Sequence, residues 1–188
     1  MHEKIFIITG PSGAGKSSVS RKVLEREPRL KRLVTHTTRP PRPNEKDGID
    51  YFFDSKEKFE EMKKNNELFE YDCHYDYCYG SRQQDLDDLL QNGLPVLIVV
   101  DPNGARTISN KLKDVCVIFI DVENDEDLLL RINKRDKGDT KGLSDRLQSI
   151  AEERKIAKIS EKVVINKTGK IDETVSEIIS LIDNLIKT

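Results

Sequence analysis

The residues best suited to chemistry form a glycine-rich segment that follows an apolar run near the amino terminus. Residues 5–18 read IFIITGPSGAGKSS, in which apolar residues precede the pattern GxxxxGKS. Glycines let successive backbone N–H groups face one anion, while the lysine and the hydroxyl that end the pattern suit phosphates and Mg²⁺. The spacing predicts a loop that binds the phosphates of a nucleotide.

Each residue of this loop has an expected task. Lys16 would place a charge beside the β- and γ-phosphates, and Ser17 would offer its hydroxyl to Mg²⁺. A helix beginning at Lys16 would direct its positive end toward the same phosphates. The expected ATP phosphate-binding residues are Ser12, Gly13, Ala14, Gly15, Lys16, Ser17 and Ser18. By itself the loop indicates a bound phosphate chain and leaves the reaction open.

Length and charge narrow the class of protein. The 188 residues suit one domain, and 32 Lys and Arg against 34 Asp and Glu give no basic field that would favour nucleic acid. The amino-terminal apolar run is too short for a secretory signal, and no stretch approaches the length of a membrane span. We therefore expect a cytoplasmic protein without a nucleic-acid or membrane partner.

The three cysteines do not indicate a disulfide framework, because their number is odd and no CxxC pair occurs. Cys116 lies in the apolar run VCVIFI and is expected in the core. Cys73, His74 and Cys78 could suggest a metal site, but no fourth ligand is nearby, so no metal is expected there.

The remaining chain alternates apolar runs with amphipathic stretches. The runs 96–100 and 115–120, separated by a helical stretch at 105–112, are typical of central strands in a parallel sheet covered on both faces. Asp54 is predicted to cap a helix with Glu57 in a capping box. Further strands are expected at 33–34, 51–53, 68–71 and 163–165, and further helices at 17–27, 81–92, 128–134, 143–160 and along the apolar-periodic terminal segment.

Ligands of parallel sheets bind at the carboxyl ends of the strands, so residues that leave those ends are candidates. After Val34 comes THTTRPPR, in which Arg39 and Arg42 lie three apart on a proline-rich segment. Two guanidinium groups could bind a second phosphate. The same residues could instead form a solvated polyproline surface loop or a short SH3 ligand, and this stretch alone leaves the choice open.

Three motifs together resemble those of the guanylate kinase family. They are GPSGAGKSS at 10–18, TTRPPRPNEKDGIDYFF at 37–53 and FEYDCHYDYCYGS at 69–81. The resemblance implies a P-loop three-layer α/β/α fold with a central parallel sheet, an inserted mixed α/β segment and a helical lid. It implies one domain, with a core of 1–34, 82–123 and 147–188, a GMP-binding segment of 35–81 and a lid of 124–146.

The resemblance also implies an enzyme that phosphorylates GMP, and dGMP as well, with ATP and Mg²⁺, as a monomer or homodimer. In such enzymes the residues matching Arg39, Arg42, Tyr51 and Tyr79 hold the GMP phosphate. Those matching Glu70, Thr35 and Asp101 recognise guanine, whose adjacent N1–H and N2–H₂ donors suit a carboxylate, and Ser81 is a further expected GMP-binding residue.

The lid arginines are the third part that the resemblance implies. Arg131, Arg135 and Arg146 would close over ATP and join Lys16 as the catalytic residues. Phosphoryl transfer needs positioning and charge neutralisation more than covalent chemistry, and the GMP phosphate is itself an anionic nucleophile. No general base is expected.

Two positions depart from the family pattern. Val99 stands where an acidic residue near the Mg²⁺ shell is common, with Pro102 and Asn103 following Asp101 in place of the more usual residues. Weaker metal support or slower turnover could result, or Asp101 could serve both purposes. Thr35 replaces the usual serine, which keeps the hydroxyl and is expected to be tolerated.

Two alternatives to a guanylate kinase are weighed on the same residues. A catalytically silent relative could use the Arg39 and Arg42 region to bind a phosphorylated peptide, but it would not need Lys16 and a complete set of loop glycines. A kinase for another nucleoside monophosphate is also possible, although Glu70 and Asp101 favour guanine.

Overall fold

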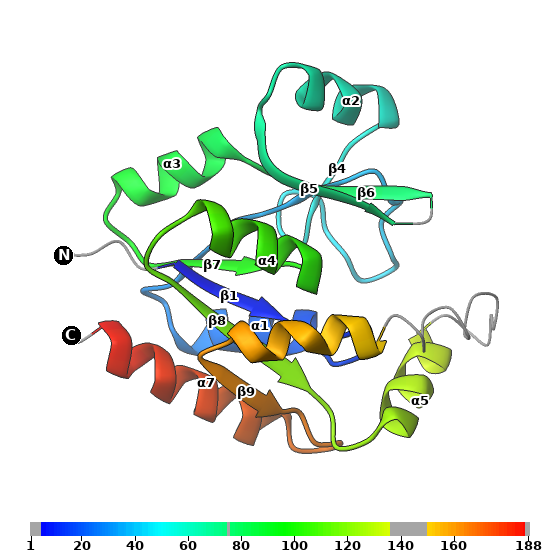
Figure 1. Cartoon of the computed structure of the whole chain (residues 1–188), viewed down its shortest axis with the longest axis vertical. Coiled ribbons are helices and arrows are strands. Elements are labelled where there is room, and N and C mark those ends of the chain that lie inside the picture. Colours follow the sequence, from blue (N-terminus) through cyan, green and yellow to red (C-terminus); the bar gives the residue numbers. More distant parts are fainter. Residues whose placement is uncertain (1–4, 75, 136–149, 187–188) are drawn as a thin grey trace.

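The protein, described by a computed structural model over residues 5–74, 76–135 and 150–186, is organised around a parallel sheet of five strands (Figure 1). Their spatial order is β2 (Lys31–Arg32), β7 (Val96–Val99), β1 (Ile5–Thr9), β8 (Val115–Asp121) and β9 (Lys162–Ile165). The helices are α1 (Lys16–Arg26), α2 (Lys56–Lys64), α3 (Gln83–Gln91), α4 (Pro102–Lys111), α5 (Asp125–Arg135), the 3₁₀ helix η1 (Arg154–Ile159) and α7 (Ile171–Ile186).

Alternate residues of β1 point to opposite faces of the sheet, and each face has its own apolar core. Phe6 and Ile8 pack in the core that is covered by α1, α5 and α7. Ile5 and Ile7 pack in the core that is covered by α3, α4 and η1. Helices therefore lie on both faces, which confirms the predicted three-layer α/β/α fold (Figure 1).

The last helix, α7, packs against the sheet through one apolar face. Val175, Ile178 and Ile182 are fully buried in the same core as Val23 of α1. This confirms that the helical spacing of apolar residues in the terminal segment serves core packing. Among the described helices, none is both long enough and apolar enough to cross a membrane.

A second, smaller sheet lies between β2 and α3 in the sequence. Its strand order is β4 (Phe52–Phe53), β3 (His36–Thr37), β6 (Tyr77–Arg82) and β5 (Leu68–His74). The pairing of β3 with β4 is parallel, and β6 is antiparallel to both β3 and β5. Helix α2 packs on this sheet through Phe59 and Met62. The predicted inserted mixed α/β segment is therefore present.

Two local predictions at the start of this segment were wrong. Leu33 and Val34 lie between β2 and β3 and not in a strand, because the chain turns from one sheet to the other there. Ser55, and not Asp54, caps α2, since its Oγ accepts from the N–H of Lys58 at 3.2 Å. The Asp54 carboxylate binds the ring of His36 instead, at 2.5 Å.

Three predicted helices have other bounds in the structure. The helix expected from residue 81 begins at Gln83, because Ser81 and Arg82 still pair with β5. The helix expected from residue 105 begins at Pro102, because Asp101 caps it. The long helix expected over 143–160 falls partly outside the described residues, and its last part, η1, is 3₁₀ helix.

The cysteine prediction was also wrong. Cys73 of β5 and Cys78 of β6 face each other across the hairpin, with their Cα atoms 4.0 Å apart, and their sulfurs form a disulfide. Whether two cysteines face each other across neighbouring strands depends on the strand register, and the number of cysteines gives no information about register. Cys116 is buried with a free thiol, as expected of a core residue.

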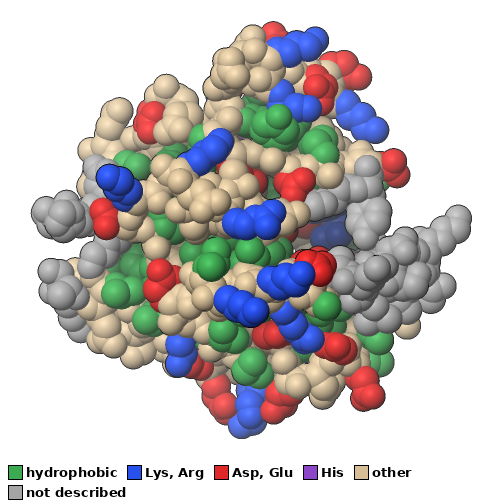
Figure 2. Space-filling model, viewed as in Figure 1, with side chains coloured by type: hydrophobic (Ala, Val, Ile, Leu, Met, Phe, Trp, Pro, Cys, Tyr) green, Lys and Arg blue, Asp and Glu red, His purple; other side chains and the backbone are tan. Residues whose placement is uncertain are grey.

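Charged side chains of both signs are interspersed over the face of the molecule shown in Figure 2. Lysine and arginine lie beside aspartate and glutamate there, in keeping with the formal net charge of −2. The ion pairs of the described residues include Lys22 with Asp172 at 2.9 Å and Lys155 with Glu152 at 2.5 Å. Pairs as exposed as these contribute little to stability.

Candidate active site

The glycine-rich pattern forms a tight loop between the end of β1 and the start of α1. Gly10, Gly13 and Gly15 have backbone φ angles of 141°, 87° and 94°, which L side chains rarely adopt. A Cβ atom on Gly10 would overlap the carbonyl oxygen of Ile120 in β8, and one on Gly15 would overlap the side-chain amide of Asn166. Conformation and packing therefore both require glycine at Gly10 and Gly15.

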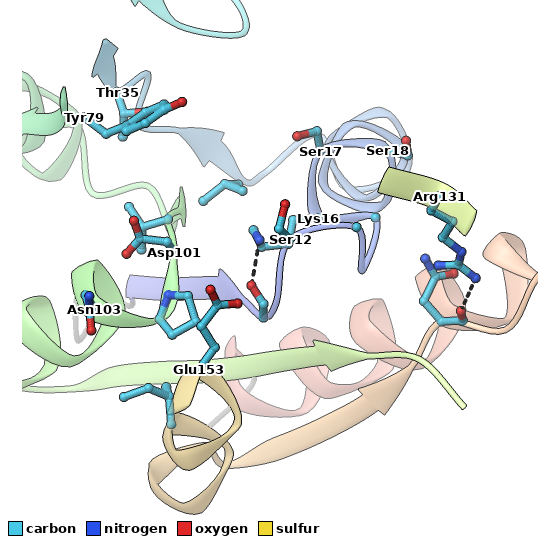
Figure 3. Close-up of a pocket in the computed structure, with 18 of the residues that line it drawn as sticks. Ser12, Lys16, Ser17, Ser18, Thr35, Tyr79, Asp101, Asn103, Arg131 and Glu153 are labelled. Atoms are coloured by element: carbon cyan, nitrogen blue, oxygen red, sulfur yellow. Dashed lines mark hydrogen bonds between the residues drawn. The ribbon is translucent and has the colours of Figure 1, made fainter. Parts of the chain in front are cut away.

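Lys16 opens α1, and its ammonium group lies over the loop that precedes it (Figure 3). Its Nζ donates to the carbonyl oxygens of Gly10 at 2.6 Å and Pro11 at 3.1 Å. The first backbone N–H groups of α1 receive no capping hydrogen bond from the side chain of the preceding residue, which is glycine. The positive end of the helix and the ammonium group together favour an anion at this loop.

A cavity of about 1380 Å³ joins this loop to the smaller sheet. A pocket for one drug-sized ligand has about 300–1000 Å³, so this cavity has room for more than one ligand. From the loop it is lined by Ser12, Gly13, Gly15, Lys16, Ser17 and Ser18. From the smaller sheet and the end of β7 it is lined by Thr35, Arg39, Arg42, Tyr51, Glu70, Tyr79 and Asp101.

Two of the predicted binding residues, Ala14 and Ser81, do not line the cavity. Ala14 is fully buried behind the loop, where its carbonyl oxygen accepts from the side-chain amide of Asn166 at 2.8 Å. Ser81 is also buried, and its hydroxyl donates to the Oε2 atom of Glu70 at 3.1 Å. Both residues therefore support groups that do face the cavity.

Arg39 and Arg42 share one carboxylate, that of Glu45. The Arg39 side chain is only 8% exposed, and its Nη2 donates to both Glu45 oxygens at 2.9 and 2.8 Å. The backbone N–H of Arg42 donates to the same carboxylate at 2.8 Å, and its Nη1 lies 3.7 Å from it. Glu45 therefore orients two cations at the cavity and offsets part of their charge. The sequence analysis assigned no role to Glu45, although an acidic residue three positions after Arg42 could have indicated an ion pair.

Aromatic rings hold the Arg39 guanidinium from the other side. Its Cζ lies 5.6 Å from the centre of the Tyr51 ring and 5.9 Å from that of Phe53. Tyr51 meets Tyr79 edge to face, with ring centres 6.0 Å apart. Burial, with a further contribution from Tyr79, raises the pKa of Tyr51, so its hydroxyl stays protonated and able to donate.

Glu70 and Asp101 bring two carboxyl groups to one end of the cavity. Glu70 is 4% exposed, and burial followed by the nearby charge of Asp101 raises the pKa of Glu70 to about 7, against the opposing effect of the Ser81 hydrogen bond. Asp101 also caps α4 by accepting from the N–H of Gly104 at 2.8 Å. Thr35, which is 3% exposed, lines the same cavity.

Arg131 of α5 is held at the opposite side of the phosphate loop (Figure 3). Its Nη2 donates to the carbonyl oxygen of Asn166 at 2.8 Å and to the hydroxyl of Thr168 at 3.0 Å, while Nη1 lies 3.4 Å from the carbonyl of Ala14. Asn166 therefore connects the loop, α5 and the end of β9. Sequence reasoning did not assign Asn166, although it directly follows a strand of the parallel sheet.

The other two predicted lid arginines cannot be placed in the site. Arg135 is the last residue of α5, and its side chain lies outside the described part of the structure. Arg146 lies wholly outside the described residues. Val99, which replaces a common acidic residue, ends β7 beside Ile8, is 6% exposed and lines the cavity.

Comparisons with known proteins agree with this geometry. The guanylate kinase family model matches residues 2–185. A guanylate kinase of Rickettsia bellii is 34% identical over 95% of this chain and 92% of its own length, and one of Fusobacterium nucleatum is 33% identical over 97% of each chain. The crystal structure of guanylate kinase from Anaplasma phagocytophilum superposes with a TM-score of 0.77 at 27% identity, over 96% of this chain and 85% of that one. The chain belongs to the guanylate kinase family.

Proposed function

We propose that this protein transfers the terminal phosphoryl group of ATP to GMP, and to dGMP, with release of ADP. The observation that carries the proposal is the shared cavity, in which a phosphate-binding loop faces an arginine pair and a pair of carboxyl groups. The family membership of the chain supports the same reaction. Because ATP and GMP are metabolites of the cell interior, the proposal includes a cytoplasmic location.

The donor, ATP, would bind with its phosphates at the loop of residues 10–18. Lys16 would exchange its contacts with the Gly10 and Pro11 carbonyls for the β- and γ-phosphates. Within the described ranges, no three His, Cys, Asp or Glu side chains form a metal site. Mg²⁺ is commonly held by substrate phosphates, waters and few protein ligands, so it would arrive with ATP and be held by the Ser17 hydroxyl. The ion would neutralise phosphate charge.

The GMP phosphate would bind to Arg39 and Arg42. Arg39 is already oriented by Glu45 and by the Tyr51 ring, so little side-chain freedom would be lost on binding. The hydroxyls of Tyr51 and Tyr79 would add donors, since both tyrosines line the cavity near these arginines. The phosphate would thus be presented from the smaller sheet toward Lys16.

Guanine would bind at the carboxyl groups of Glu70 and Asp101, with Thr35 and Ser81 beside them. Ionised Glu70 can accept from both N1–H and N2–H₂ of guanine, whereas adenine has a lone pair at N1. Each hydrogen bond to a charged group contributes on the order of 1.5–3 kcal/mol, and an unpaired buried carboxylate adds a further cost for the wrong base. The same burial that raises the pKa of Glu70 makes this discrimination stronger.

Transfer itself would rely on position and charge. The attacking oxygen belongs to the GMP phosphate, which is anionic at neutral pH, so no side chain has to remove a proton. Lys16 and Arg131 would balance the charge that develops between the two nucleotides, joined by Arg135 and Arg146 from outside the described part of the site. A phosphopeptide-binding role would leave Lys16 and the positive-φ glycines of the loop without a use.

A panel of acceptors tests the proposed function. With ATP and Mg²⁺, ADP release should be at least about 100-fold more efficient, as kcat/KM, with GMP or dGMP than with AMP, because two charge-assisted hydrogen bonds separate the bases. CMP and UMP should be equally poor acceptors. Comparable efficiency with AMP would contradict the guanine assignment, and no ADP release with any acceptor would favour the binding module.

Replacing Arg42 by Ala tests the phosphate site. The Arg42 side chain is 43% exposed, so solvent screening limits its contribution, and we expect KM for GMP to rise about tenfold. KM for ATP should not change, because the loop of residues 10–18 is untouched. Lys46→Ala removes an exposed cation from the same segment and should leave both constants as they are. An unchanged KM for GMP in Arg42→Ala would exclude this phosphate site.

The raised pKa of Glu70, about 7, predicts how the use of GMP depends on pH. Below this pH the carboxyl group is protonated and cannot accept from both guanine donors, so kcat/KM for GMP should fall as the pH drops. Between pH 8 and pH 6 the ionised fraction of such a group falls about tenfold. The GMP phosphate also titrates near pH 6, so the change must be measured against a variant.

Glu70→Gln is that variant, because it keeps the shape of the side chain and removes the titration. The ratio of kcat/KM for GMP, wild type over Glu70→Gln, should fall several-fold between pH 8 and pH 6. Phosphate titration cancels in this ratio. Glu60→Gln, an exposed position on α2, should follow the wild-type profile. A constant ratio across this pH range would show that Glu70 does not accept from guanine as an anion.

A further inference from the structure

The disulfide between Cys73 and Cys78 lies in the part of the protein that would bind GMP. Cys73 lines the cavity, three residues after Glu70 on β5. Cys78 directly precedes Tyr79 on β6. The bond therefore connects the two strands that carry a guanine-binding and a phosphate-binding side chain of the proposed site.

The backbone of Cys78 also holds the segment that leads to the arginine pair. Its carbonyl oxygen accepts from the N–H of Thr38 and from the hydroxyl of Thr37, each at 3.0 Å. Its N–H donates to the hydroxyl of Thr38 at 2.9 Å. The Thr37 hydroxyl in turn accepts from the N–H of Arg39 at 3.2 Å. A shift of the hairpin at Cys78 would therefore be passed to Arg39.

The two linked cysteines differ in exposure, and the third cysteine is isolated from them. Cys73 is exposed, whereas Cys78 is half-buried against the small core formed by Phe59, Met62 and Leu68. Burial, with the nearby charge of Glu161, raises the pKa of Cys116 to about 12, so that thiol is inert at neutral pH. Thiol–disulfide exchange with a small thiol is therefore restricted to Cys73 and Cys78, and it begins at the exposed Cys73.

A disulfide in a protein that acts on ATP and GMP is unlike the permanent links of secreted proteins. Reducing conditions inside cells keep most thiols free, and the disulfides that form there are usually catalytic or redox-sensing. The link is not the sole connection within the hairpin, because β5 and β6 are also paired from Leu68 to His74. The two cysteines are only five residues apart in the sequence. A disulfide that closes so short a loop removes little entropy from the unfolded chain and therefore stabilises the fold least.

We propose that Cys73 and Cys78 form a reversible thiol–disulfide site that adjusts the affinity for GMP. The oxidant is a low-molecular-weight disulfide such as oxidised glutathione. The Cys73 thiolate attacks one of its sulfurs and releases one small thiol; the Cys78 thiolate then attacks the Cys73 sulfur and releases the second. Two protein thiols are oxidised, one small disulfide is reduced to two thiols, and the two protons pass to the released thiolates.

The direction of the effect follows from the contacts of the hairpin. In the oxidised protein, Glu70, Tyr79 and the Thr37–Arg39 segment are held together before GMP arrives. In the reduced protein, some of this order has to be gained on binding, which costs about two- to tenfold in affinity for each group that is immobilised. Reduction should therefore weaken GMP binding about two- to tenfold and leave ATP binding at the distant loop unchanged.

Calorimetry on the whole protein tests the site. One sample is equilibrated with oxidised glutathione and a second with dithiothreitol, both are freed of reagent, and the Kd values for GMP and for ATP are measured. Mass spectrometry should show the loss of two hydrogens in the first sample and one remaining thiol, at Cys116. The Kd for GMP should be about two- to tenfold lower in the oxidised sample.

Two variants serve as matched controls. Cys73→Ser with Cys78→Ser should bind GMP like the reduced protein under both treatments, whereas Cys116→Ala should respond to them like the wild type. If the serine variant does not fold, the two treatments of the wild-type protein still decide the question.

The inference rests on the proposed function, and the outcomes separate the two. Equal Kd values for GMP in the oxidised and reduced samples, or no disulfide at any glutathione ratio, would overturn the redox site alone. Absence of GMP binding in both samples would overturn the proposed function and the inference with it.

Discussion

The parallel pairing of β1 with both β7 and β8 is the constraint on which the rest of the structure depends. The register places Ile8 beside Val99 and Ile118, so all three strands end at one edge of the sheet. At that edge Gly10 contacts the carbonyl of Ile120 so closely that no other residue fits. The phosphate loop, the Asp101 carboxylate and the end of β8 are thereby brought to one place before any ligand is present.

Around that edge, the charged side chains differ in how well they are balanced by a partner. Arg39 is matched by Glu45, and the two oxygens of Glu45 also receive the backbone of Arg42. Asp101 is held by the first turn of α4, while Glu70 accepts one hydrogen bond from the described side chains, that of the Ser81 hydroxyl, and its pKa is raised. Glu70 is thus the least compensated of these groups, which suits a side chain whose proposed partners are the donors of a guanine base.

Much of the fold can be predicted from local pattern. The spacing of Gly10, Gly15 and Lys16 specifies a loop geometry within eight residues, and the uninterrupted apolar runs identify β7 and β8 because a strand covered on both faces has no polar side. The ends of helices and strands are less predictable where two groups compete for the same capping side chain. Asp54 could have capped α2, but His36, eighteen residues earlier in the sequence, takes its carboxylate.

Glu45 was missed although its partners Arg39 and Arg42 are local, but the other features missed in the site have partners that are distant in sequence or depend on strand register. Asn166 supports Ala14 across 152 positions of sequence, and no local pattern contains that contact. Cys73 and Cys78 become partners only once the β5–β6 hairpin has its register. The proposed catalytic roles of Arg135 and Arg146 stay predictions, because their side chains lie outside the described part of the chain.

The central claim is that ATP and GMP occupy the two sides of one cavity with their phosphates facing each other. A molecule in which adenosine and guanosine are joined 5′ to 5′ by a pentaphosphate chain tests it most directly. If both sites share the cavity, this molecule should compete with ATP and with GMP and bind about 100-fold or more tightly than GMP alone, since its second half binds intramolecularly. Competition with only one of the two nucleotides, at no gain in affinity, would contradict the account.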